Sequence, residues 1–212
     1  MKILITAGPT YERIDPVRFI GNYSSGKMGF AIAEACTASG HEVTLVSGPV
    51  RLEVSHPSIR RIDVESAAEM YEAVLSRWPE MDGAVLCAAV ADFTPVNVAA
   101  EKIKREGDNL ILELKPTRDI AAAVGAAKRE GQFLVGFALE TNDEEAHALE
   151  KMRRKNLDFI VLNSLKDKGA CFGYDTNKIT VLMGAGERIA FPLKPKTEVA
   201  RDIVDLINRI RK

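Results

Sequence analysis

The amino-acid sequence predicts an α/β protein with a Rossmann-like, three-layer fold: a mostly parallel sheet, helices on both faces and a small C-terminal β-hairpin extension. Two observations support this prediction. Apolar runs of strand length alternate with segments of helical period, which implies β-α-β crossovers and therefore parallel strands. Near the end of the chain, the runs 177–183 and 188–191 predict a hairpin that precedes a last helix.

The individual elements follow from the spacing of apolar residues. Residues 2–7 (KILITA) form an uninterrupted apolar run that ends at Gly8-Pro9, which predicts a buried strand. From Gly26 to about Ser39 the apolar residues fall on one helical face. The same reasoning predicts strands over 42–47, 59–64, 82–89, 133–138 and 157–162, helices over 66–78, 119–130 and 142–155, and a C-terminal helix with Val199, Ile203, Leu206, Ile207 and Ile210 on one face.

Such a sheet also predicts where a ligand binds. Ligands of parallel sheets lie beyond the carboxyl ends of the strands, so the loops after residues 7, 47, 88, 138 and 162 are the candidates. The sequence contains neither an internal repeat nor a low-complexity segment. We therefore expect one domain over residues 1–212.

Composition argues against several classes of protein. Lys and Arg number 29 and Asp and Glu 30, a net charge of −1, whereas proteins that bind nucleic acid usually carry a basic excess. There is no apolar stretch of about 18 residues to span a membrane, and the first residues predict a strand rather than a signal peptide. We expect a cytoplasmic protein. Neither a reactive cysteine nor a zinc site is expected, because the cysteines and histidines show no suitable spacing: Cys36, Cys87, Cys171, His41, His56 and His147.

The segment before the first helix is the first candidate for phosphate binding. Residues 21–28 (GNYSSGKM) fit G-x-x-x-x-G-K, but Met28 stands where a phosphate-binding loop needs Ser or Thr to hold Mg²⁺, so a nucleoside-triphosphatase loop is disfavoured. Ser24, Ser25 and Gly26 still offer hydroxyl and N–H groups at a helix N-terminus. An ordinary Ser-capped helix is the alternative interpretation.

Three further segments have residues suited to a nucleotide. Asp92 follows a run of small residues at a strand end, where it could hold Mg²⁺ or could simply be a turn aspartate. Residues 101–105 (EKIKR) place three cations in a loop, either to cover a triphosphate or as a solvated surface. Phe137 could stack on a base or belong to the core, and Lys151 and Lys155 share one helix face beyond it.

Together these segments resemble the phosphopantothenate–cysteine ligase (phosphopantothenoylcysteine synthetase) family, in particular its bacterial, CTP-dependent type. The blocks ITAGPT, IDPVRFIGNYSSGKMGFAIAEA, VTLVSGPV, CAAVADFTP, EKIKRE, GFALETN and KNLDFIVLN match in order and spacing over most of the chain. Ligases of this family are often fused behind a flavin-dependent decarboxylase. No such segment precedes Met1, so we expect a stand-alone enzyme or an excised domain, with association to a decarboxylase possible.

The resemblance implies a two-step reaction of coenzyme A biosynthesis. The carboxylate of 4′-phosphopantothenate attacks the α-phosphate of CTP and gives an acyl-cytidylate and pyrophosphate. The amine of L-cysteine then displaces CMP and forms the amide. CTP is thus implied as co-substrate and Mg²⁺ as its metal ion, with no covalent nucleophile on the protein. A homodimer in which one subunit completes the other's site is implied as well.

The resemblance also implies roles for individual residues. Asn22 steadies the acyl-nucleotide, Arg18 acts beside it in the same step, and Lys102 reaches the phosphates from a flap. Ser24, Ser25 and Gly26 remain candidates for binding phosphate or substrate from the helix-start argument above, not from the resemblance. The implied nucleotide contacts are Ala88, Asp92 on the metal and ribose side, Lys102, the base-reading Arg118, Asp119, Ile120 and Ala121, and Phe137, Lys151 and Lys155.

The sequence departs from the family pattern in two respects. Tyr23 and Leu139 are uncommon, and Pro116-Thr117-Arg118 precedes Asp119 where Asn-Pro is expected. The difference before Asp119 leaves the choice between CTP and ATP open. Two other functions remain as alternatives. An NAD(P)-dependent reductase would use the same scaffold, although only Gly8 follows the first strand where a G-x-G-x-x-G fingerprint is required. A non-catalytic nucleotide-binding regulatory subunit would bind CTP without turnover.

Overall fold

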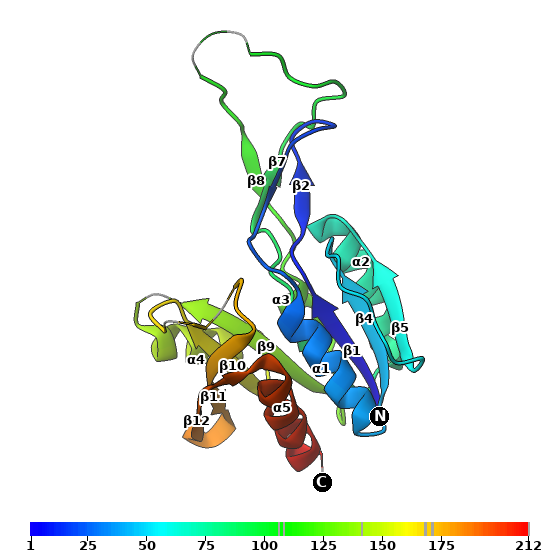
Figure 1. The fold of residues 1–212 in the computed structure, drawn as a ribbon, viewed down its shortest axis with the longest axis vertical. Helices are drawn as coiled ribbons and strands as arrows, with labels where there is room; N and C mark the ends of the chain where they lie inside the picture. Colours follow the sequence, from blue (N-terminus) through cyan, green and yellow to red (C-terminus); the bar gives the residue numbers. More distant parts are fainter. Residues whose placement is uncertain (106, 108, 141, 168, 171, 212) are drawn as a thin grey trace.

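A central sheet organises the computed structural model, which describes residues 1–105, 107, 109–140, 142–167, 169–170 and 172–211. Within those residues the sheet has eight strands in the order β12-β11-β10-β9-β6-β1-β4-β5 (Figure 1). The strands are β1 (Lys2–Ala7), β4 (Glu42–Ser47), β5 (Ile59–Asp63), β6 (Gly83–Leu86), β9 (Phe133–Glu140), β10 (Phe159–Ser164), β11 (Thr176–Met183) and β12 (Arg188–Pro195).

The strand directions confirm the predicted fold class. From β5 to β10 every neighbouring pair is parallel. The β11–β12 hairpin adds to β10 in the antiparallel sense and is the predicted C-terminal extension. The carboxyl ends of the parallel strands therefore meet at one edge of the sheet.

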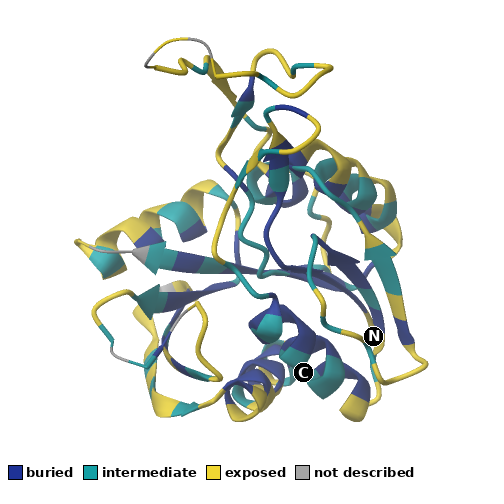
Figure 2. Ribbon diagram, turned by 45° about the horizontal axis from the view of Figure 1, so that its top comes forward, coloured by how far each residue is buried: buried dark blue, intermediate teal, exposed yellow. Residues whose placement is uncertain are grey.

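Helices cover both faces of this sheet. The helices α1 (Lys27–Ala38) and α5 (Lys196–Ile210) pack together on one face, and α2 (Ala67–Arg77), α3 (Ile120–Ala126) and α4 (Glu144–Arg154) cover the other (Figure 1). The sequence of β1 is apolar throughout because both of its faces are buried. Ile3 and Ile5 pack under α1, whereas Leu4 packs toward α2 on the other face. In Figure 2 the buried residues accordingly follow the sheet and the inner helix faces.

Two predicted elements are shorter in the structure. The helix predicted over 119–130 ends at Ala126, because Lys128 turns to the segment between α4 and β10 and donates to Asn156 O (2.8 Å) and Asp158 (3.1 Å). The strand predicted over 82–89 ends at Leu86, since the following loop bonds to threonine side chains (see below). The predicted start of α2 is confirmed: Ser66 caps it, and Glu69 completes the capping box.

An arm of two short ribbons stands off the carboxyl edge of the sheet (Figure 1). One ribbon pairs β2 (Tyr11–Arg13) with β3 (Phe19–Gly21), and the other pairs β7 (Phe93–Pro95) with β8 (Leu114–Pro116). The sequence analysis predicted loops in both places, because three-residue strands are too short to show a period of two. The described residues between β7 and β8 (96–105, 107 and 109–113) lie at the far end of these ribbons and are counted as part of the arm (Figure 1).

Among the described residues, no helix is both long and apolar enough to cross a bilayer.

Candidate active site

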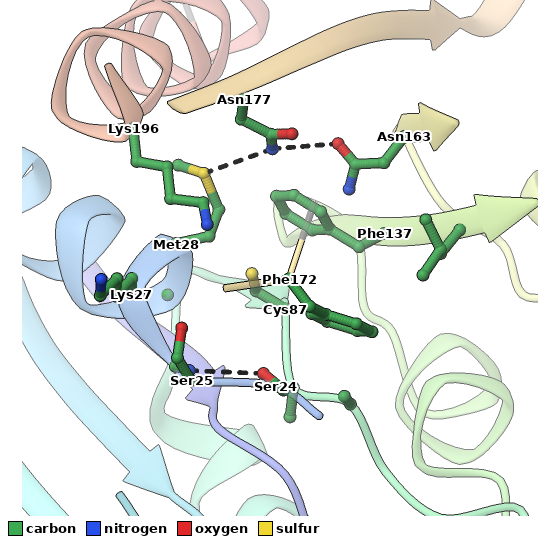
Figure 3. A pocket seen from close by; sticks show the side chains of 15 residues that line it. Ser24, Ser25, Lys27, Met28, Cys87, Phe137, Asn163, Phe172, Asn177 and Lys196 are labelled. Carbon is green, nitrogen blue, oxygen red and sulfur yellow. Dashed lines mark hydrogen bonds between the residues drawn. The ribbon is translucent and has the colours of Figure 1, made fainter. Parts of the chain in front are cut away.

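A cavity of about 170 Å³ opens at the carboxyl edge of the sheet, on the face covered by α1 and α5. It lies where the strand-end rule predicted a site, between the start of α1 and the ends of β6, β9 and β10 (Figure 3). The residues that line it are Ser24, Ser25, Gly26, Lys27, Met28, Gly29, Cys87, Ala88, Ala89, Phe137, Leu139, Asn163, Phe172, Asn177 and Lys196.

Glycines bring the start of α1 to this cavity. Gly26 is the N-cap residue, with a left-handed φ of 78° and no hydrogen bond from a capping side chain, so the Ser-capped alternative is wrong. At Gly29 a Cβ atom would come within 2.6 Å of the Cβ of Ala7, so only glycine lets the helix lie this close to β1. The first turn contains no acidic residue. Its N–H groups are therefore suited to an anion such as phosphate.

The loop that follows β6 is held by buried threonines. Ala88 N donates to the hydroxyl of Thr6 (3.1 Å), and Ala91 N donates to that of Thr10 (2.9 Å). Thr10 is completely buried. Asn22 adds a third tie, because its Nδ2 donates to Ala89 O (2.9 Å) and to Val90 O (3.3 Å). The structure thus brings Asn22 to the same loop as Ala88.

The far wall of the cavity carries polar residues that the sequence analysis missed (Figure 3). Asn177 Nδ2 donates to Asn163 Oδ1 at 3.0 Å, which fixes the orientation of the Asn163 amide. Lys196, only 7% exposed, donates from Nζ to Tyr174 O at 2.5 Å. Asn163 lies directly after residue 162, where a loop was expected to contribute, but no motif marks Asn177 or Lys196.

Cys36 and Cys87 are unsuited to act as thiol nucleophiles. Burial raises the pKa of both Cys87 and Cys36 to about 12, so these thiols stay protonated at neutral pH. Cys87 lines the cavity beside Lys196, whereas Cys36 belongs to the core. Cys171 lies outside the described residues. Among the described residues no three His, Cys, Asp or Glu side chains form a metal-binding group.

Several predicted nucleotide contacts lie beside the loop after β6 but not on the cavity wall. Thr117 N donates to Asp92 O (2.9 Å), which places the start of α3 next to Asp92. Asp119 caps α3 through Ala122 N (2.9 Å) and pairs with Lys155 (2.9 Å). Burial acts to raise the pKa of Asp119, but these two contacts outweigh it and lower the pKa.

The other predicted residues of this segment have partners elsewhere. Arg118 stacks over the ring of Tyr71 (3.8 Å to the centroid) and pairs with Glu72 of α2 (2.7 Å). Ile120 is the first residue of α3 and is buried in the core. Ala121 follows it in the first turn of this helix. Lys151 lies on α4 and does not line the cavity.

Arg18 and Lys102 both lie on the arm. The guanidinium of Arg18 pairs with Asp15 and donates to Ile103 O (2.9 Å), and Lys102 is exposed next to that residue. Neither of them lines the cavity. Within one chain, the structure thus unites Asn22, Ser24–26, Ala88 and Phe137 but leaves the predicted phosphate-contacting cations outside.

Comparison with known proteins gives the same assignment as the sequence blocks. A family model described as "DNA/pantothenate metabolism flavoprotein C-terminal domain" matches residues 1–210. The chain belongs to this family. One relative, the coenzyme A biosynthesis bifunctional protein CoaBC of Bacillus subtilis, is 47% identical over 99% of this chain and 52% of its own length. Another, a cysteine/cysteine sulfinic acid decarboxylase from an unknown prokaryotic organism, is 56% identical over 96% of this chain and 56% of its length.

The chain spans about half the length of these relatives, and a solved structure shows which half. The crystal structure of the C-terminal domain of CoaBC is 43% identical, with a TM-score of 0.84 over 99% of this chain and 94% of that domain. A Cab2 variant in complex with phosphopantothenate-cysteine shares the fold at 17% identity (TM-score 0.77; 98% of this chain and 85% of that one). None of these findings supports the alternative of an NAD(P)-dependent reductase.

Proposed function

We propose that this chain is one phosphopantothenate–cysteine ligase domain over residues 1–212, which joins 4′-phosphopantothenate to L-cysteine with CTP. The observation that supports the proposal most directly is the cavity itself. An anion-binding helix start, a loop of small residues and the ring of Phe137 converge there at the carboxyl edge of a parallel sheet. Nearly the whole chain also matches the C-terminal domain of a bifunctional coenzyme A biosynthesis protein.

The reaction proceeds in two displacements. A carboxylate oxygen of phosphopantothenate forms a bond to the α-phosphorus of CTP as the bond to pyrophosphate breaks. The cysteine amine then attacks the acyl carbon, CMP leaves with the bonding electrons, and the amine loses a proton. Because the protein supplies no nucleophile in this scheme, its residues act by positioning and charge stabilisation. The α1 N-terminus binds phosphate, and Asn22 orients the acyl-nucleotide against the loop after β6.

The carboxylate of Asp92 suits the metal ion that accompanies a nucleoside triphosphate. Mg²⁺ in such sites is commonly held by one or two carboxylates together with substrate phosphates and water, rather than by a cage of protein ligands. Asp92 is exposed at the carboxyl edge, and its backbone is fixed by Thr117. The ion would neutralise phosphate charge, and Asp92 would orient it toward the ribose side.

We also propose that the arm pairs two copies of the chain into a homodimer. Large apolar side chains are exposed along it and along 96–113: Val17, Phe19, Tyr23, Phe93, Val96, Val98, Leu110, Ile111 and Leu114. Apolar groups gathered on a projecting ribbon are typical of a protein interface. In such a dimer, the arm of one chain would bring its cations, such as Lys102, to the cavity of the other. This would explain why Lys102 does not line the cavity of its own chain. Where the chain is part of a larger protein, the partner expected is a flavin-dependent decarboxylase.

A pyrophosphate-release assay tests the ligase. With phosphopantothenate and CTP, the protein should release about one equivalent of pyrophosphate without cysteine and turn over when cysteine is added. ATP in place of CTP tests the base preference, and mass spectrometry identifies the amide product. If CTP binds but no nucleoside triphosphate yields pyrophosphate, the chain is a regulatory subunit and the ligase proposal is wrong.

A further inference from the structure

The turn between β2 and β3 contains a buried carboxylate to which the proposed reaction assigns no role. The side chain of Asp15 is 0% exposed, and an ionised carboxylate is stable in such a place only when its oxygens are paired. Oδ1 accepts the N–H groups of Val17 and Arg18, each at 2.8 Å. Oδ2 accepts from Nε and Nη2 of Arg18 at 3.0 and 2.5 Å.

The remaining partner of this carboxylate lies far along the chain. Oδ2 of Asp15 also accepts the backbone N–H of Ile103 at 3.1 Å, across a separation of 88 residues. Nη2 of Arg18 donates to the carbonyl of the same residue at 2.9 Å. Both backbone polar groups of Ile103 are thus held by one Asp–Arg pair. A further backbone bond, from Ala99 N to Ile14 O (3.0 Å), fixes the approach of the segment.

Ile103 is the neighbour of the lysine proposed to reach the phosphates. The side chains around it point into solvent, since Lys102, Lys104 and Arg105 are all exposed. A lysine has a long, freely rotating side chain, so a fixed backbone at its base reduces the entropy lost when it meets a phosphate. The Asp15–Arg18 pair lies where it can provide that fixed point.

We infer that Asp15 is a positioning residue, which clamps the backbone at Ile103 together with Arg18 and so places Lys102 for the first displacement. The role of Lys102 rests on the proposed function, whereas the clamp is a property of the folded chain alone. Arg18 then acts on the first displacement by holding the backbone of Ile103. This role is separate from the one that the resemblance implies, in which Arg18 acts beside Asn22 on the acyl-nucleotide.

Asp15→Asn tests the clamp in the full chain. The amide keeps the shape of the side chain but replaces one anionic acceptor with an NH₂ group, which faces donors. We expect hydrogen exchange at residues 99–105 to become at least about tenfold faster. The burst of pyrophosphate at saturating CTP should slow by about tenfold or more, while amide formation from the preformed acyl-cytidylate stays within about twofold of wild type.

Asp158→Asn is the matched control. Asp158 likewise accepts a backbone N–H (Leu134, 2.6 Å) and a cation (Lys128, 3.1 Å), but it lies at the opposite, amino edge of the sheet. It should lower thermal stability without changing exchange at 99–105 or the burst. If Asp15→Asn does not fold, Arg18→Met serves instead for the exchange and burst readouts alone, because a thioether donates to neither Asp15 nor Ile103 O.

The two readouts separate the failure of this inference from failure of the proposed function. Wild-type exchange and a wild-type burst in the Asp15 variant would overturn the inference. Faster exchange with an unchanged burst would also overturn it, because the clamp would then not position Lys102. If wild-type protein makes no pyrophosphate, the ligase proposal fails and the exchange result still decides whether the clamp exists.

Discussion

Replacing Thr10 by valine should weaken both the fold and the reaction, because its hydroxyl is one of the ties that hold the loop after β6, which lines the cavity. Thr10 is fully buried, and its Oγ1 accepts the N–H of Ala91, a residue that is itself only 6% exposed. Valine has nearly the same shape but no acceptor. The N–H of Ala91 would then be buried without a partner.

The size of the effect follows from that unpaired group. Leaving a buried donor unsatisfied costs about 1–3 kcal/mol. For a chain of this length about 1 kcal/mol lowers the melting temperature by roughly 2–4 °C, so the variant should melt roughly 2–12 °C below wild type. The loop that carries Ala88 and accepts from Asn22 would also lose one of its ties, which should slow pyrophosphate release and amide formation together.

A second buried threonine provides the control for this experiment. Thr37 is 6% exposed, but its hydroxyl donates to Ala33 O (3.2 Å) and Glu34 O (2.9 Å) of its own helix. Those carbonyls can also accept helical N–H groups, so Thr37→Val leaves no donor stranded and should cost less than about 1 kcal/mol. Calorimetry and the pyrophosphate assay on both variants decide the matter. Equal melting shifts, with activity of Thr10→Val within twofold of wild type, would refute the reasoning.

Three further predictions use the same assays. Asn22→Asp should release pyrophosphate but stall before the amide, because a carboxylate faces Ala89 O where the amide donated; normal product formation would contradict this role. Lys102→Gln should slow mainly the first displacement, since a neutral amide cannot balance phosphate charge; an unchanged burst excludes it from the site. The Arg18 hydrogen bond lowers the pKa of Asp15, so the stability that wild type has over Asp15→Asn should be full near neutral pH and shrink as the pH falls below about 4. Urea unfolding at both pH values measures it, and a constant difference would contradict the assignment.

The sheet could be predicted because its strands are covered on both faces. Such strands need uninterrupted apolar runs, and β1 and β6 show them plainly. The arm could not be predicted, since its strands have three residues each and depend on contacts such as the stacking of Tyr11 on Phe19 (3.8 Å between centroids). The end of α3 was misplaced for a similar reason, because the contacts of Lys128 with the segment before β10 override the helical pattern.

The sequence likewise predicts some residues of the candidate site but not others. Ala88 and Phe137 follow from the rule that ligands bind beyond the carboxyl ends of parallel strands. Asn177 and Lys196 line the same cavity, yet only the tertiary fold brings them there, from the hairpin and the start of α5. Arg118 shows the converse, because its sequence neighbours suggest a base-reading role while its side chain lies on Tyr71 and Glu72.

The contacts divide the proposed active site into two parts with different tasks. Around the cavity, the backbone is fixed before any ligand arrives: Thr6 and Thr10 hold the loop after β6, and the glycines of α1 fix the helix start. The cation Lys102 instead lies on the arm, where a single Asp–Arg pair holds the backbone beside it. Both displacements need the nucleotide bound in the cavity, but only the first must neutralise a departing pyrophosphate. Changes to the threonines should therefore impair both steps, and Asp15→Asn only the first.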